Sequence, residues 1–185
     1  TPGSLAVGIK RHTFRELGQI QLECYFTFKP EASTLQLGEM DVRAAGVLFD
    51  IQDGGGDDAK RWMPHLRYLN ALDSERVARW QTKPQTRAFE AIGDTGKTVS
   101  HYHLGPEGWV DVPADPQRLC YNEIATKMNW HYLRVGLDLK KRAFTGFQCN
   151  DQIYGHEQLT CIEMPAMANL WCMLNVAFWC EADSD

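Results

Sequence analysis

The stretch Trp130-His-Tyr-Leu-Arg-Val-Gly-Leu-Asp-Leu139 alternates apolar and polar side chains, and it decides the fold. The polar segment Lys140-Lys-Arg142 follows it, and a second alternating stretch then runs from Ala143 to Asn150 and on to Tyr154. In a strand, every second side chain points to the same face, so the leucines and valine from Leu133 to Leu139 share one face. The opposite face carries Tyr132, Arg134 and Asp138. We therefore predict a strand, a tight polar turn and a second antiparallel strand.

Similar strand signals recur along the chain at intervals of roughly 10 to 15 residues. The predicted strands are Gln19 to Phe28, Ala45 to Gln52, Trp62 to Leu72, Val77 to Gln81, Thr98 to Leu104, Trp109 to Val112 and Leu170 to Cys180. Leu66 to Arg79 also fits a helix, because it contains Leu, Ala, Glu and Arg. Without a convincing long amphipathic helix, short strands at this spacing favour one all-β domain over residues 1–185, built as an antiparallel two-sheet sandwich.

The last predicted strand has two chemically distinct faces. Its apolar face, which we expect to be buried, carries Leu170, Cys172, Leu174, Val176, Phe178 and Cys180. The opposite face carries Trp171, Asn175, Trp179 and Glu181. A strand that presents two tryptophans and an amide away from its apolar face is a candidate for ligand binding.

Composition restricts the class of partner. The chain is 44% hydrophobic and 23% charged, with a formal net charge of -5, so it has no basic field for nucleic acid or an anionic membrane surface. No apolar run approaches the roughly 18 residues of a membrane helix, and residues 1–10 lack the features of a signal peptide. Six scattered cysteines without a C-x-x-C pair are typical of free thiols, which favours the cytoplasm while leaving localisation open.

Trp130-His131 followed by Cys149-Asn150-Asp151-Gln-Ile-Tyr154 resembles the concanavalin A-like lectin/glucanase superfamily, including its laminin-G-like modules. In that superfamily a W-H-x-hydrophobic strand precedes a hairpin whose second arm ends in an N/D-G-x turn. The resemblance implies a jelly roll of two curved antiparallel sheets, with a glycan held on the concave face. Members include lectins, carbohydrate-binding modules, glycosidases and polysaccharide lyases, so the fold leaves the activity open.

Glu39-Met-Asp41 resembles the first half of the E-x-D-x-x-E strand of retaining glucanases. Alternation would place both carboxylates on one face, and retaining hydrolysis uses two carboxyls about 5–5.5 Å apart. Arg43, Ala44 and Ala45 stand where the third acid is expected. Solvated acids at a strand start are therefore the favoured interpretation.

Sugar recognition combines flat aromatic faces with planar polar groups, and this chemistry selects the candidate ligand-binding residues. They are Trp171, Trp179, Asn175, Tyr132, Arg134, Arg67 and His65. The surface could be extended by Trp62, Tyr68, Trp80 and Trp109. The alternative is that several tryptophans complete the core or cover an oligomer interface.

Glycoside hydrolysis would need carboxylates, and Glu123 is the first candidate because apolar neighbours would raise its pKa through burial. Asp50 or Asp111 would be its partner. Whether the chain is an enzyme stays open at this point, and the sequence assigns no cofactor. The partner that we expect is a carbohydrate.

Two metal hypotheses compete with these. His101, His103 and Glu107 spell H-x-H-x-x-x-E, which resembles the first metal motif of the cupins, another jelly-roll group, although cleft-lining histidines without metal are the favoured interpretation. Asp53-Gly-Gly-Gly-Asp-Asp58, with Asp50, would offer oxygens for calcium, but a solvated acidic turn is the favoured interpretation, because Asp and Gly favour turns for conformational reasons alone. A third class is a non-catalytic interaction domain that forms a homodimer through an exposed sheet or aromatic patch.

Overall fold

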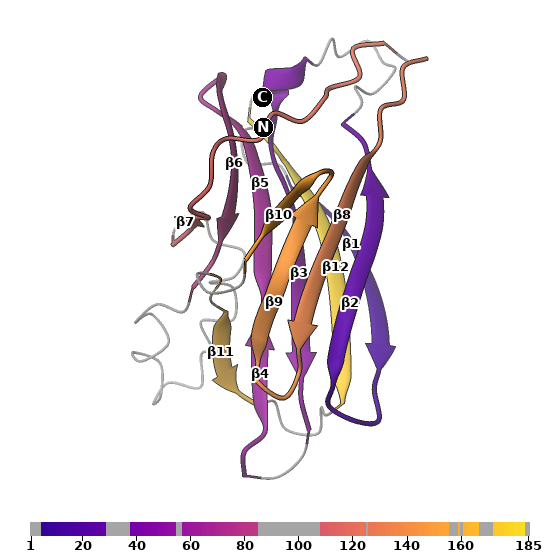
Figure 1. Ribbon diagram of the computed structural model, residues 1–185, viewed down its shortest axis with the longest axis vertical. Coiled ribbons are helices and arrows are strands. Elements are labelled where there is room, and N and C mark those ends of the chain that lie inside the picture. Colours follow the sequence, from indigo (N-terminus) through magenta and orange to yellow (C-terminus); the bar gives the residue numbers. More distant parts are fainter. Residues whose placement is uncertain are drawn as a thin grey trace.

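The structure is a computed structural model. It describes residues 5–28, 38–54, 57–84, 108–124, 126–155, 159, 161–166 and 172–183. These residues form two antiparallel sheets that face each other as a sandwich (Figure 1). They include one short 3-10 helix, η1 (Glu39–Asp41), and no α-helix. The prediction of an all-β sandwich is therefore confirmed.

The larger sheet has eight strands. Its main path runs β1 (Leu5–Thr13), β12 (Met173–Ala182), β3 (Val42–Gln52), β5 (His65–Leu72), β6 (Glu75–Thr82) and β7 (Val110–Asp111). β4 (Lys60–Met63) pairs with β3, and β11 (Ile162–Pro165) pairs with β4. The order brings strands from both halves of the chain into neighbouring positions, so this sheet is assembled by long-range contacts.

The smaller sheet has four strands and lies in front of the larger one in Figure 1. Its order is β10 (Gln152–Tyr154), β9 (Ala143–Cys149), β8 (His131–Asp138) and β2 (Gln19–Phe26). β8 and β9 are the strand pair predicted from Trp130 to Asn150. β2 was predicted from Gln19 to Phe28, and the strand ends two residues earlier.

The core lies between the inner faces of the two sheets. Val47, Phe49 and Ile51 of β3 face Val135 and Leu137 of β8, and all five are at most 1% exposed. Each strand contributes alternate side chains because its other face points away from the opposite sheet. The apolar face predicted for β8 is thus the face that holds the sandwich together.

A buried glutamine fixes the loop that follows β7 against this core. The Gln117 side chain accepts hydrogen bonds from Trp80 Nε1 at 2.8 Å and Tyr154 Oη at 3.0 Å, and it donates to the Cys149 carbonyl at 2.8 Å. Its backbone carbonyl accepts a bond from Tyr68 Oη at 2.9 Å. Buried polar groups need such partners, so the network sets where this loop crosses the sandwich.

Several elements of the chain differ from the predictions. The helix alternative for Leu66 to Arg79 is wrong, because β5 and β6 form a hairpin there. Its turn residues Asp73 and Ser74 have φ of 52° and 63°, the left-handed pair that suits a tight hairpin. β1 and β11 are strands that the sequence pattern did not reveal, and the single strand predicted at Trp62 to Leu72 is two strands, β4 and β5.

The predicted strand at Thr98 to Leu104 lies outside the described residues. All six cysteines are free. Among the residues that the structure describes, no helix has the length and apolar character needed to cross a membrane.

Candidate functional site

The outer face of the larger sheet carries polar side chains that are withdrawn from solvent. His65 and Arg67 of β5 are 1% and 8% exposed, and Gln81 and Lys83 at the end of β6 are 9% and 0% exposed. A sheet face directed away from the core is ordinarily solvated, so buried polar side chains there need an explanation. They belong to a group that we call the outer-face cluster. Its members are His65, Arg67, Gln81, Lys83, Trp109, Asp111 and Trp179.

Strand register places most of the cluster in one row across the sheet. Trp179 on β12 is opposite Gly46 on β3, Gly46 is opposite Arg67 on β5, and Arg67 is opposite Gln81 on β6. Gln81 is in turn opposite Asp111 on β7. Side chains at paired positions share a face of the sheet, so five neighbouring strands build this row together.

Three aromatic rings form the centre of the cluster. The ring centroid of His65 lies 4.5 Å from that of Trp109 and 5.5 Å from that of Trp179, and the two indoles are 6.1 Å apart. Trp179 Nε1 donates a hydrogen bond to His65 Nε2 at 2.9 Å. An indole nitrogen can only donate, so Nε2 of His65 is an acceptor, and its proton must be on Nδ1. The bond therefore fixes both the indole and the neutral imidazole tautomer.

Gly46 is the residue that lets the Trp179 indole lie across the sheet. A Cβ at this position would be 2.5 Å from Trp179 Cζ2 and 2.8 Å from the Leu66 carbonyl oxygen. Both distances are below any real van der Waals contact, and the carbonyl belongs to the backbone of the adjacent strand. The close approach thus requires glycine, which has no side chain to clash.

Polar groups surround the rings in a connected chain. The Arg67 guanidinium lies 4.1 Å from the Trp109 ring centroid, and Lys83 Nζ lies 5.2 Å from it. Arg67 Nε donates to Gln81 Oε1 at 2.7 Å, and Gln81 Nε2 donates to Asp111 Oδ1 at 2.7 Å. Cations held over an indole face are attracted by its negative π cloud. The guanidinium is thus positioned by a ring on one side and an amide on the other.

Burial lowers the pKa of Arg67 to about 10, and the negative charges of Glu181 and Asp111 act in the opposite direction. At neutral pH the side chain is still a cation. The cluster therefore combines aromatic faces with donors and acceptors in fixed orientations.

Three of the predicted ligand-binding residues, His65, Arg67 and Trp179, meet in this cluster. Asn175 lies on the same face of β12, where its Oδ1 accepts a hydrogen bond from Arg11 Nε at 3.0 Å. Trp171 lies outside the described residues.

Tyr132 and Arg134 point to the outer face of the smaller sheet, on the opposite side of the sandwich. The Tyr132 ring packs against Tyr25 at 5.4 Å. The aromatic residues Trp62, Tyr68 and Trp80, which the sequence offered as extensions of the binding surface, are instead core residues, at most 5% exposed.

The predicted carboxylates take separate positions. Glu123 has a side chain that is 65% exposed and pairs with Lys127 Nζ at 2.7 Å. Its hydrogen bond from Lys127 lowers its pKa, so the expectation of a pKa raised by burial is wrong. Asp50 accepts two hydrogen bonds from Arg61, at 2.7 and 2.9 Å. Of the three acids, Asp111 alone belongs to the outer-face cluster, and none of their described bonds or ion pairs joins one to another.

Neither metal hypothesis gains a site from the described residues. His101, His103 and Glu107 lie outside them. Asp53, from the acidic loop, is 5% exposed, and its carboxylate accepts hydrogen bonds from the Arg142 side chain and from the Lys60 backbone amide. Among the described residues, no three His, Cys, Asp or Glu side chains are grouped as metal ligands.

Sequence reasoning missed Gln81 and Lys83, although a signal for them exists. The stretch Trp80-Gln-Thr-Lys83 continues the alternation of its strand, with Trp80 inward and Gln81 and Lys83 on the other face. Two long polar side chains at successive outward positions beside a His-x-Arg strand would have marked the same face. Their burial could not be predicted from this stretch alone, because Trp109 and Trp179, which pack beside them, come from distant segments.

Comparison with known proteins places this architecture in a family. None of the curated proteins and none of the solved structures matches the chain. A family model described as "Domain of unknown function (DUF6772)" matches residues 1–185. The chain, with its open two-sheet sandwich and its outer-face cluster, belongs to the DUF6772 family.

Proposed function

We propose that the chain binds a carbohydrate on the outer face of the larger sheet, at the outer-face cluster. One observation carries the proposal: two indoles and an imidazole lie within 6.1 Å of one another beside a guanidinium and a carboxamide. A sugar ring offers apolar C–H groups to aromatic faces and hydroxyls to planar polar groups. The cluster supplies both kinds of partner on one face of the sheet, and its more accessible members are the half-buried Trp109 and Trp179 and the exposed Asp111.

The cluster is also fixed before any ligand arrives. Gln81 links Arg67 to Asp111 through bonds of 2.7 Å on each side, and Trp179 is held by His65. Side chains that are already ordered lose less conformational entropy on binding. This organisation supports recognition of a ligand in one defined orientation.

Binding has more support than hydrolysis. Glycosidases use two carboxyls, about 5–5.5 Å apart in retaining enzymes and about 6.5–9.5 Å apart in inverting ones. Asp111 is a cluster residue, but Glu123 is paired with Lys127 and Asp50 with Arg61. No contact therefore supports Glu123 and either aspartate as a catalytic pair. Our proposal is accordingly a carbohydrate-binding domain.

Affinity electrophoresis against a panel of neutral and acidic polysaccharides tests the proposal. At least one polysaccharide should retard the wild-type protein, and Trp109→Ala and Trp179→Ala should each weaken that binding about tenfold or more, which is 1.4 kcal/mol. Far-UV circular dichroism and thermal unfolding establish that each variant is folded.

Trp130→Ala is the matched control, because Trp130 is 55% exposed and is not part of the cluster. Its affinity should equal that of the wild type. The proposal fails if no polysaccharide retards the wild type, or if the two cluster variants bind as well as Trp130→Ala does.

A further inference from the structure

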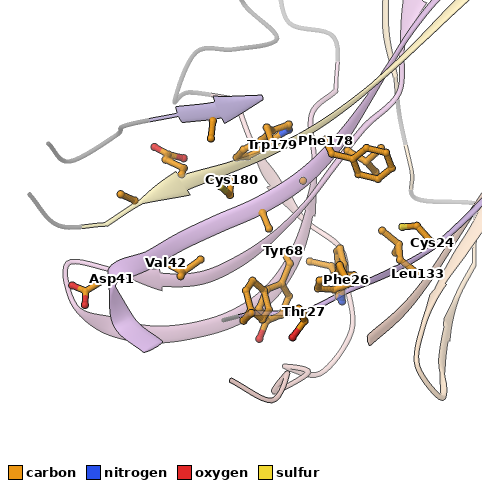
Figure 2. Close-up of a pocket in the computed structure, with 18 residues that line it drawn as sticks. Cys24, Phe26, Thr27, Asp41, Val42, Tyr68, Leu133, Phe178, Trp179 and Cys180 are labelled. Carbon is orange, nitrogen blue, oxygen red and sulfur yellow. The ribbon is translucent and has the colours of Figure 1, made fainter. Parts of the chain in front are cut away.

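A cavity of about 500 Å³ lies between the two sheets, and its lining shares Trp179 with the outer-face cluster. Figure 2 shows side chains from both sheets around it. The smaller sheet contributes Cys24, Phe26 and Leu133, and the larger sheet contributes Tyr68 and Phe178 among others. It is therefore a gap in the core of the sandwich.

The gap arises because the sheets differ in width. Beyond β2 the smaller sheet has no further described strand, whereas the larger sheet continues through β12 to β1. On the inner face of β12, Val176 is 6% exposed, but Phe178, two residues further along the same face, is 40% exposed. Exposed apolar surface costs about 25 cal/mol per Å² relative to burial, so an apolar occupant would stabilise this region.

The polar groups that line the cavity already have partners in the protein. Thr27 Oγ1 donates to the Asn129 carbonyl at 2.9 Å and accepts a bond from Asn122 at 2.5 Å. The Asp41 carboxylate accepts the Gly38 amide at 2.5 Å.

Glu181 pairs with Arg43 at 3.4 Å, and the Tyr68 hydroxyl donates to the Gln117 carbonyl at 2.9 Å. Most of the lining side chains are apolar, and the few polar ones are bonded within the protein. The lining therefore suits an apolar molecule.

We propose that this inter-sheet cavity is a binding site for an uncharged apolar small molecule. An apolar cavity of about 150 Å³ is enough to bind benzene, and small-molecule pockets are typically about 300–1,000 Å³. The cavity of about 500 Å³ thus accommodates a medium-length alkyl chain or a small fused ring system. Phe26, Tyr68 and Phe178 supply its aromatic contacts.

The first test uses the neutral fluorescent dye Nile red as the probe and dodecanol as the competitor. Wild-type protein should enhance Nile red emission, and dodecanol should reverse that enhancement. Cys180→Phe places a ring in the cavity and should weaken dye binding about tenfold or more, while the thermal midpoint stays the same or rises. Cys120→Phe is the control, because Cys120 is also exposed but does not line this cavity.

The second test needs no variant and so does not depend on how a variant folds. Thiol alkylation of the wild-type protein is followed by peptide mass spectrometry, with and without dodecanol. Dodecanol should slow alkylation of Cys180 several-fold and leave the Cys120 rate unchanged.

The proposal is overturned if Nile red binds wild type and Cys180→Phe equally, or if dodecanol leaves the Cys180 rate unchanged. It is also overturned if Cys180 is protected without dodecanol in a protein dimer, because a second copy would then fill the gap. Loss of dye binding in Cys180→Phe with intact polysaccharide binding would support the cavity alone.

Discussion

Replacing Gly46 with alanine would place a methyl group where the structure has no space for one. The new Cβ would lie 2.5 and 2.6 Å from two atoms of the Trp179 indole and 2.8 Å from the Leu66 carbonyl oxygen. The indole can rotate away only by giving up its hydrogen bond to His65, and the carbonyl belongs to the β3–β5 pairing. Overpacking of this kind costs about 1–3 kcal/mol.

A smaller effect acts in the other direction. Alanine restricts the unfolded chain and stabilises the fold by about 0.4–1 kcal/mol where its backbone conformation is tolerated. We therefore expect Gly46→Ala to lower the free energy of unfolding by about 1–2 kcal/mol, measured by urea unfolding followed by tryptophan fluorescence. The same variant should weaken polysaccharide binding, because the Trp179 indole is displaced.

Gly8→Ala is the matched control, because Gly8 is in β1 of the same sheet and nothing lies within 4 Å of its added Cβ. Its stability should equal or slightly exceed that of the wild type. If Gly46→Ala proved as stable as Gly8→Ala and bound polysaccharide normally, the close packing of Trp179 over β3 could not be what organises the cluster.

Two further predictions concern charge and pH. Arg142→Met should lower the free energy of unfolding by about 1–3 kcal/mol, because it leaves the buried Asp53 carboxylate without its cation. Arg79→Met should lower it by under about 1 kcal/mol in the same urea assay, because both partners of the Arg79–Asp111 pair are exposed. Equal losses in the two variants would contradict this reasoning. Burial raises the pKa of Tyr68 from 10.0 to about 12, so its stabilising contribution is fully present below pH 10 and is lost as the pH rises through about 12. Tyr68→Phe should therefore flatten the decline of stability over that interval, and an unchanged slope would be evidence against a buried phenol.

The alternation of β8 and β12 was enough to predict both strands and the face of each that meets the core. In β8 the opposite sheet covers the apolar face, whereas in β12 it covers Val176 and leaves Phe178 and Cys180 exposed, so the expectation that these two are buried is wrong. β1 lacks this signal, since its inner positions Gly8 and Lys10 lie on the side where the smaller sheet has ended. A strand without a buried face leaves no hydrophobic period to read.

The β5–β6 hairpin was ambiguous for a different reason. Leu66 to Arg79 is rich in residues that also form helices, and its turn uses Asp73 and Ser74 rather than the asparagine–glycine pair that marks such turns. Pairing with β3, which is distant in the sequence, decides that this segment is a hairpin, and local propensity cannot predict that pairing.

The candidate site was predictable strand by strand, but its assembly was not. Alternation puts His65 and Arg67 on one face, yet only the register across the sheet brings Gln81 beside them. Alternation likewise predicts which face of its strand Tyr132 occupies, but it does not predict that this strand belongs to the smaller sheet. For Glu123, apolar neighbours suggested burial, but Ile124 is itself 60% exposed in this loop.

The most direct measurement for the carbohydrate proposal is a titration of the protein with an oligosaccharide of the bound polysaccharide, followed through the NMR signals of the tryptophan indole N–H groups. We predict that the signals of Trp109 and Trp179 shift with saturation, while those of the exposed Trp130 and the core residue Trp62 stay in place. Shifts confined to Trp130, or saturable binding that leaves Trp109 and Trp179 unchanged, would contradict a carbohydrate site at the outer-face cluster.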